Sequence, residues 1–130
     1  MPYIEAKITL PLTESQKEEL KTGFGKTMSI IGKPEAFLMV NIEDGKDLWF
    51  AGEKLEKGAY VSLSLLGNST SENYAKVTKE VCALLDEKLG IDPKGVYVTY
   101  HPVSDWGWNG NNFWYNIYFY VKLYEYKILF

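Results

Sequence analysis

Pro2 and Lys33 are the residues of this chain whose types could support acid–base chemistry on a small anion. If Met1 is removed, Pro2 becomes a free secondary amine at the start of a β-prone segment, with a fixed φ and no flexible side chain. An α-amino group has a reference pKa of about 7.7–8.0, so a modest lowering would give a base near neutral pH. A lysine beside this amine would bind a carboxylate and lower the amine's pKa by like-charge repulsion. The alternative is that Pro2 only directs Met1 removal and that Lys33 is a solvated charge at a helix C-terminus, where the helix dipole favours it.

Composition limits the classes of partner and cofactor. A length of 130 residues suits one domain, and a net charge of −3 with no arginine argues against nucleic acid as a partner. Cys82 is the one cysteine and His101 the one histidine, so neither a disulfide nor a metal site is expected, and the chemistry above needs no cofactor. No signal peptide and no membrane-spanning run before residue 113 is recognisable. We therefore expect no membrane partner and a cytoplasmic location, or secretion without a signal peptide.

The first half of the chain is predicted to form a strand, a helix and a strand. The strands are expected at residues 2–10 and 37–42, and Thr13 with Gln16 fits a capping box that opens the helix between them. The helix should end at Gly32. Apolar residues at helical spacing predict its buried face, which consists of Leu20, Phe24, Met28 and Ile31.

The second half repeats this plan, since residues 31–42 align with residues 89–100 apart from one shift near the proline. Strands are expected at 60–66 and 95–101, with a helix between them that Ser69 and Glu72 would cap and Gly90 would end. Two such units predict an α+β fold with a four-stranded mixed sheet and both helices on one face. Parallel strands of one unit start at the same edge of the sheet, so Pro2 and Lys33 should lie close together.

Several motifs resemble the macrophage migration inhibitory factor (MIF) family of the tautomerase superfamily over residues 1–113. The segments that carry the resemblance are Met1-Pro2, Gly32-Lys33-Pro34, Leu65-Leu66-Gly67, Val96-Tyr97-Val98 and Trp106-Gly107-Trp108-Asn109-Gly110. The resemblance implies a homotrimer whose sheets line a central channel. It also implies keto–enol tautomerisation of α-keto acids, namely arylpyruvates such as phenylpyruvate, and of dopachrome-like compounds, without a cofactor. The alternative that the family offers is a non-enzymatic, cytokine-like signalling or binding protein.

The same resemblance assigns roles to individual residues. Pro2 would be the catalytic acid and base, Lys33 would hold the substrate carboxylate and the Leu66 backbone N–H would orient it. Tyr97 and Thr99 would reach in from a neighbouring subunit. An aromatic wall would be formed by Phe37 and Trp108. Tyr97 could instead be an ordinary strand aromatic, and Cys82 is expected in the core.

Three departures from the family pattern affect these expectations. Gly58 and Val61 stand where the human family member has a CxxC pair, so thiol oxidoreductase activity is not expected. Thr99 replaces a family asparagine and is shorter. The chain also continues beyond a 1–113 domain, and we expect its β-prone extension, residues 114–130, to form an extra strand or a packed arm. A broad apolar sheet face opposite the helices is expected to favour the trimer.

Overall fold

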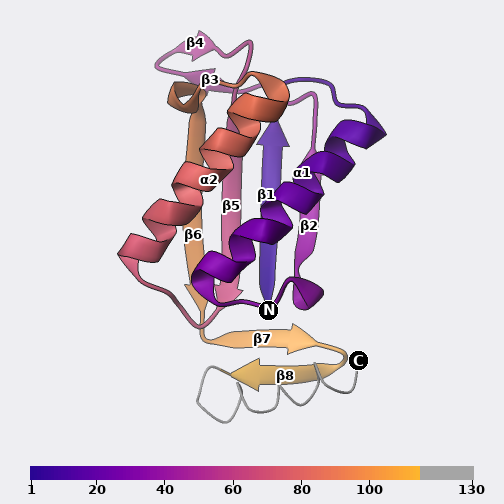
Figure 1. Cartoon of the computed structure of the whole chain (residues 1–130), viewed down its shortest axis with the longest axis vertical. Helices are drawn as coiled ribbons and strands as arrows, with labels where there is room; N and C mark the ends of the chain where they lie inside the picture. The colour runs from indigo at the N-terminus through magenta and orange to yellow at the C-terminus, as the bar shows by residue number, and fades with distance from the viewer. Residues whose placement is uncertain (115–130) are drawn as a thin grey trace.

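The computed structural model describes residues 1–114, which contain two strand–helix–strand units side by side (Figure 1). The first unit is β1 (Pro2–Ile8), α1 (Glu14–Thr27) and β2 (Met39–Glu43), and the second is β5 (Ala59–Leu66), α2 (Ser71–Leu89) and β6 (Val96–Val103). The sheet order is β2-β1-β5-β6, parallel within each unit and antiparallel between β1 and β5. The predicted α+β fold with a four-stranded mixed sheet is confirmed.

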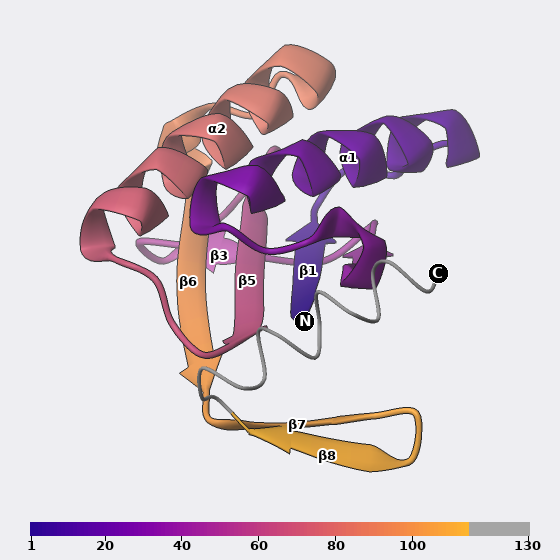
Figure 2. The same ribbon diagram turned by 60° about the horizontal axis from the view of Figure 1, so that its bottom comes forward.

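Both helices cover one face of the sheet, as predicted, and the core lies between the two layers (Figure 2). The predicted stripe is buried, although its last two residues belong to the 3₁₀ helix η1 (Met28–Ile31) and not to α1. From the second unit, α2 contributes Val77, Val81 and Leu85 to the same core. The periodicity of apolar residues therefore predicted the buried faces correctly even where the helix type changes.

Two local predictions were wrong at element boundaries. Phe37 does not begin a strand, because Pro34 leads into the 3₁₀ turn η2 (Glu35–Phe37), which the Leu38 N–H closes by donating to the Glu35 carbonyl over 2.9 Å. Ser69 does not cap α2, because Thr70 takes that position and accepts from the Asn73 N–H at 3.0 Å. The Thr13 capping box of α1 is confirmed.

Two short hairpins, which sequence analysis did not predict, complete the described part of the chain. One pairs β3 (Trp49–Phe50) with β4 (Glu53–Lys54), and the other pairs β7 (Asp105–Trp108) with β8 (Asn111–Trp114). The β7–β8 hairpin lies beyond the end of the sheet where β1 begins and where β5 and β6 end (Figures 1 and 2). Its turn residues Asn109 and Gly110 have φ of 53° and 71°, the left-handed pair typical of an Asn-Gly hairpin turn.

The sheet face opposite the helices is mostly polar, contrary to the expected broad apolar surface, although Met39, Tyr60 and Tyr97 are exposed on it. Burial alternates strictly along β1, so that apolar residues face the helices. The same alternation holds along most of β5. The other face therefore carries Tyr3, Glu5, Lys7, Ser62 and Ser64. A broad apolar sheet face therefore does not favour a trimer of this chain, and the trimer stays a prediction on other grounds.

No helix within residues 1–114 is long and apolar enough to cross a membrane. The predicted boundary at residue 113 lies inside β8, which ends at Trp114. The strand or arm predicted for the extension otherwise lies outside the described residues.

Candidate active site

Pro2 lies at the first position of β1 and pairs with Leu65 near the end of β5. A cavity of about 1060 Å³ opens at this end of the sheet and has Pro2 in its lining. The lining comes from the starts of β1 and β2, the ends of β5 and β6, the turn before β2, and strand β7 of the β7–β8 hairpin. Its members are Met1, Pro2, Tyr3, Ala36, Phe37, Leu38, Met39, Ser64, Val103, Asp105, Trp106, Gly107 and Trp108. The sheet and the hairpin thus bring residues from both halves of the chain to Pro2.

Leu66 links Met1 and Lys33 through its two backbone polar groups. Its N–H donates to the Met1 carbonyl at 3.1 Å, and its own carbonyl accepts from Lys33 Nζ at 2.8 Å. Leu66 is 1% exposed and lies in a small apolar cluster with Met1. The backbone group and the cation that the resemblance assigns to one substrate carboxylate therefore meet at a single residue.

Lys33 is placed by the glycine that ends the first helical segment. Gly32 has a φ of 66°, and the Lys33 N–H donates to the Met28 carbonyl at 3.1 Å, which turns the chain back towards the sheet. Lys33 is only 7% exposed, so the solvated-charge alternative is wrong. Burial and, secondarily, the Lys33 ammonium lower the pKa of the Met1 α-amine from 8.0 to about 5. This end of the sheet disfavours a protonated amine.

Aromatic rings form the wall of the cavity. Phe37 and Trp108 line it and meet edge to face, with ring centroids 5.4 Å apart. Phe113 is not part of the lining, and its ring centroid lies 6.2 Å from that of Trp108. Trp106 belongs to the same lining, and sequence reasoning did not select it as a site residue. The signal was present, because Trp106 and Trp108 alternate on one strand and therefore share a face.

Tyr97 and Thr99 are not brought to Pro2 of the same chain. Tyr97 pairs with Tyr60 and Thr99 with Ser62, whereas Pro2 pairs with Leu65 farther along β5. At about 3.3 Å per residue these positions are roughly 16 Å and 10 Å from Pro2 along the sheet. The Tyr97 ring is 65% exposed and touches Phe50 edge to face, with centroids 5.8 Å apart.

Thr99 belongs to a hydrogen-bonded row on the polar face of the sheet. Its hydroxyl lies 2.8 Å from the Tyr60 hydroxyl and 2.8 Å from His101 Nε2. Contacts of this kind hold the side chain along the strand edge, and within one subunit they do not direct it towards the cavity. A role of Tyr97 or Thr99 in the site would therefore require a second subunit.

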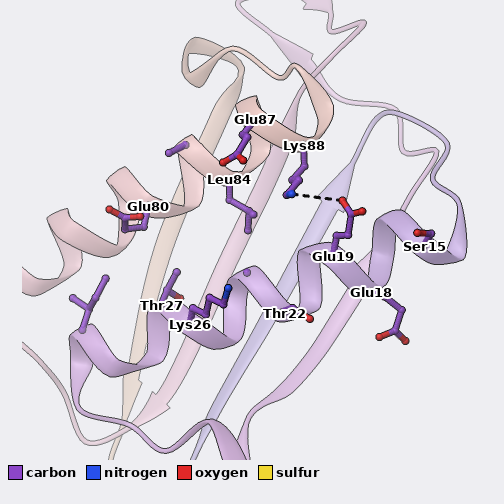
Figure 3. Close-up of a pocket in the computed structure, with 13 residues that line it drawn as sticks. Ser15, Glu18, Glu19, Thr22, Lys26, Thr27, Glu80, Leu84, Glu87 and Lys88 are labelled. Atoms are coloured by element: carbon purple, nitrogen blue, oxygen red, sulfur yellow. Dashed lines mark ion pairs between the residues drawn. The ribbon is translucent and has the colours of Figure 1, made fainter.

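A second hollow, of about 680 Å³, lies between α1 and α2 (Figure 3). Gly23 allows the helices to approach there, because a Cβ at this position would lie 2.5 Å from Leu84 Cδ1. Charged side chains line the hollow, and Lys88 pairs with Glu19 at 3.9 Å. Both of these side chains are substantially exposed, so the hollow resembles an ordinary solvated groove more than a site for proton transfer.

Cys82 lies on α2, half-buried against the core, and burial raises the pKa of its thiol. A thiol with a raised pKa forms less of the nucleophilic thiolate. Residues 1–114 hold no group of three or more His, Cys, Asp or Glu side chains that could bind a metal ion.

Comparison with known proteins identifies the family. The family model for macrophage migration inhibitory factor (MIF) matches residues 1–114. A macrophage migration inhibitory factor homolog from Trichuris trichiura is 29% identical over 115 residues, which covers 87% of this chain and all of the relative.

Solved structures agree with this assignment. Leishmania major MIF2 superposes with a TM-score of 0.81 and 27% identity, covering 87% of this chain and 97% of the other. The fused 4-OT wild type symmetric trimer has a TM-score of 0.74 at 23% identity, covering 84% and 93%, and shows the fold alone. With a family match over residues 1–114 and the same fold, this chain belongs to the macrophage migration inhibitory factor family.

Proposed function

We propose that this chain is a cofactor-independent isomerase that interconverts the keto and enol forms of arylpyruvates such as phenylpyruvate, and of dopachrome-like compounds. Pro2, freed by removal of Met1, is the acid and base. The observation that carries the proposal is the position of Pro2 at the head of β1, in a cavity with an aromatic wall. Its strand partner Leu65 is followed by Leu66, whose carbonyl accepts from the buried Lys33.

The reaction needs one proton to be moved between two atoms of the substrate. The Pro2 amine accepts a proton from the carbon next to the carbonyl, and the C–H electron pair forms the carbon–carbon double bond. The carbonyl π pair moves to oxygen, which then receives the proton from Pro2, so that atoms and electrons balance. The aromatic wall around Phe37 and Trp108 packs against the aryl group.

The substrate carboxylate is assigned to the Leu66 N–H and the Lys33 ammonium. Removal of Met1 takes away the carbonyl that accepts from Leu66. A carboxylate at this place would accept from the same N–H and would be attracted by Lys33. This arrangement suits a monocarboxylate.

The strength of the base follows from its surroundings. Burial and the Lys33 ammonium lower the pKa of the Met1 amine, and both causes also act on a Pro2 amine one residue further along β1. A lowered pKa leaves the amine unprotonated near neutral pH. Turnover should rise as the pH passes upward through that pKa, because only the free amine accepts a proton.

We further propose that three subunits assemble and that Tyr97 and Thr99 complete the site of the neighbouring subunit. The support is the exposure of Tyr97, the distance of both residues from Pro2 of their own chain, and the symmetric trimer of the fused 4-OT neighbour. Light scattering with a stable monomer at micromolar concentration would remove this role for both residues.

The test of the activity uses phenylpyruvate and three preparations: the processed protein, the protein with Met1 retained, and Pro2→Gly. We expect full, no and partial turnover respectively, because retention of Met1 turns the amine into a non-basic amide, whereas glycine keeps an amine without the rigid ring. Equal rates with and without Met1, checked by mass spectrometry of the N-terminus, would refute the role of Pro2. A processed, folded protein with no turnover would instead favour the cytokine-like binding protein.

A further inference from the structure

Met1 is buried at the candidate site and is not a loose end of the chain. It is 3% exposed and forms an apolar cluster with Leu66. Four partly buried aromatic residues pack against the pair, and they are Phe37, Trp106, Trp108 and Phe113. The first residue of the chain thus fills space beside the same aromatic wall that the proposed function assigns to the substrate.

The backbone of Met1 also occupies a hydrogen-bond donor that the proposed function assigns to the substrate. Its carbonyl accepts from the Leu66 N–H, the group assigned above to the substrate carboxylate. This hydrogen bond could simply continue the β1–β5 ladder by one bond. That continuation does not explain why the side chain of Met1 is buried. Met39, another methionine that lines this cavity, is 68% exposed, so burial of a methionine is not imposed on every position there.

We propose that Met1 occupies the place of the substrate, and that its removal vacates a subsite for 2-oxo acids with an unbranched aliphatic or thioether side chain. This inference rests on the proposed function for the role of Pro2, and it widens the substrate class beyond arylpyruvates. An unbranched thioether adapts to irregular apolar space and makes favourable sulfur contacts with aromatic rings. The carboxylate of such an acid would lie near Lys33, where burial and, secondarily, the like charge of Lys33 lower the pKa of the Met1 amine.

The reaction on such an acid is the one proposed above. Pro2 takes a proton from C3, the C2=C3 bond forms and the carbonyl oxygen receives the proton, with no other reactant. The flexible side chain attached to C3 would then lie near Trp106, Trp108 and Phe37, the aromatic residues that pack against the cluster of Met1 and Leu66 in the unprocessed chain.

Binding of a carboxylate that cannot enolise tests the subsite independently of catalysis. The probe is 4-(methylthio)butanoate, which has the thioether chain but no 2-oxo group, and its affinity is measured by calorimetry. The processed protein is compared with one released from a fusion partner so that Met1 remains. We expect Met1 retention to weaken binding by at least about tenfold, and 3,3-dimethylbutanoate, which is branched, to bind the processed protein less tightly than the probe.

A matched pair of tryptophans on one hairpin provides the control. Trp106→Ala should weaken binding of the probe by about tenfold through lost apolar contact. Trp114→Ala should leave it unchanged, because Trp114 is 59% exposed and does not line the cavity. Trp106→Leu, which keeps an apolar side chain, should give an intermediate affinity and covers the case in which the alanine variant does not fold.

Equal binding with and without Met1, or equal binding by the two tryptophan variants, would overturn the subsite. The proposed function can fail separately. Binding of the probe without turnover of phenylpyruvate would remove the tautomerase activity and keep the subsite, whereas turnover of phenylpyruvate without binding of the probe would do the opposite.

Discussion

The two repeats of this chain place different residues after the same kind of glycine turn. Gly32 and Gly90 end the two helical segments with φ of 66° and 67°, and the residue after each donates its N–H back to the preceding segment. In the second repeat that residue is Ile91, which is fully buried in the main core. In the first repeat it is Lys33, which is almost equally buried but carries a charge.

The difference separates what the fold needs from what the site needs. The backbone at this position requires only a residue that continues from a left-handed glycine, and Ile91 shows that an apolar side chain satisfies it. Burial of an ammonium costs free energy unless it is well hydrogen-bonded, and Lys33 recovers part of that cost from the Leu66 carbonyl. We infer that the lysine serves the chemistry proposed for Pro2 and not stability.

The largest effect on stability is expected when a lysine is placed at the equivalent position of the second repeat. Ile91→Lys should lower the free energy of unfolding by about 3–5 kcal/mol, the usual range for an uncompensated buried charge. Urea unfolding followed by circular dichroism measures the change, with Ile91→Val as a mild control. A loss below 1 kcal/mol would mean that any long side chain is accepted after this turn, and Lys33 would lose its special status.

The converse substitution should separate activity from stability. Lys33→Met should reduce turnover of phenylpyruvate on the order of 10²-fold, as removal of one preorganised charge-stabilising donor commonly does. Its free energy of unfolding should stay the same or increase, because a buried charge is replaced by an apolar side chain. Lys94→Met, at an exposed lysine of the second repeat, should change neither quantity. Parallel losses of activity and stability in Lys33→Met would assign this lysine to the fold.

A pH titration measures how strongly the charge of Lys33 lowers the pKa of the Met1 amine. In the protein that retains Met1, the amine has a pKa of about 5 when folded and a reference value of 8.0. Between these values the unfolded chain binds more protons, so stability should rise from about pH 5 to pH 8 and level off outside that window.

Lys33→Met should narrow this window, because loss of the like charge raises the folded pKa of the Met1 amine towards 8.0. Unfolding in urea at several pH values, together with NMR titration of Met1, tests both statements. Identical titration curves for the two proteins would show that burial alone lowers the pKa of the amine.

The smallest expected effect concerns the two helix caps, which share one threonine hydrogen bond, although only α1 has the reciprocal bond of a capping box. Thr13 and Thr70 each accept a hydrogen bond from the N–H three residues later. Replacement of either by alanine should cost about 1 kcal/mol of stability and leave turnover unchanged. Stability is again measured in urea, and a selective loss of activity in Thr70→Ala would show that the caps are not equivalent.

Features with a local signature were predictable from the sequence. Helical spacing predicted the buried stripe that runs through α1 and η1. The similarity of residues 31–42 to residues 89–100 predicted the topology, which in turn placed Pro2 and Lys33 at one end of the sheet. The polar face was also readable, because Tyr60, Ser62 and Ser64 alternate with apolar residues along β5. The expectation of an apolar face opposite the helices was wrong, although the alternation of polar and apolar residues could be seen in the sequence.

Features that depend on distant packing were not predictable in the same way. Trp106 reaches the cavity because the β7–β8 hairpin lies across the end of the sheet, a placement that no local pattern specifies. Asn109-Gly110 between aromatic residues is a recognisable hairpin signal, but it does not say where the hairpin packs. The roles of Tyr97 and Thr99 depend on a second subunit, so a single chain cannot decide them.

The β7–β8 hairpin has a consequence for how such a protein can diversify. It carries Trp106, Trp108 and Phe113 on a two-stranded sheet of its own, whereas Pro2 belongs to the four-stranded sheet. Mutations in the hairpin can therefore reshape the wall around a ligand while the β1–β5 ladder and the amine at its end are inherited unchanged. Lineages that share Pro2 at this position are free to drift apart in the compounds they accept, one hairpin substitution at a time.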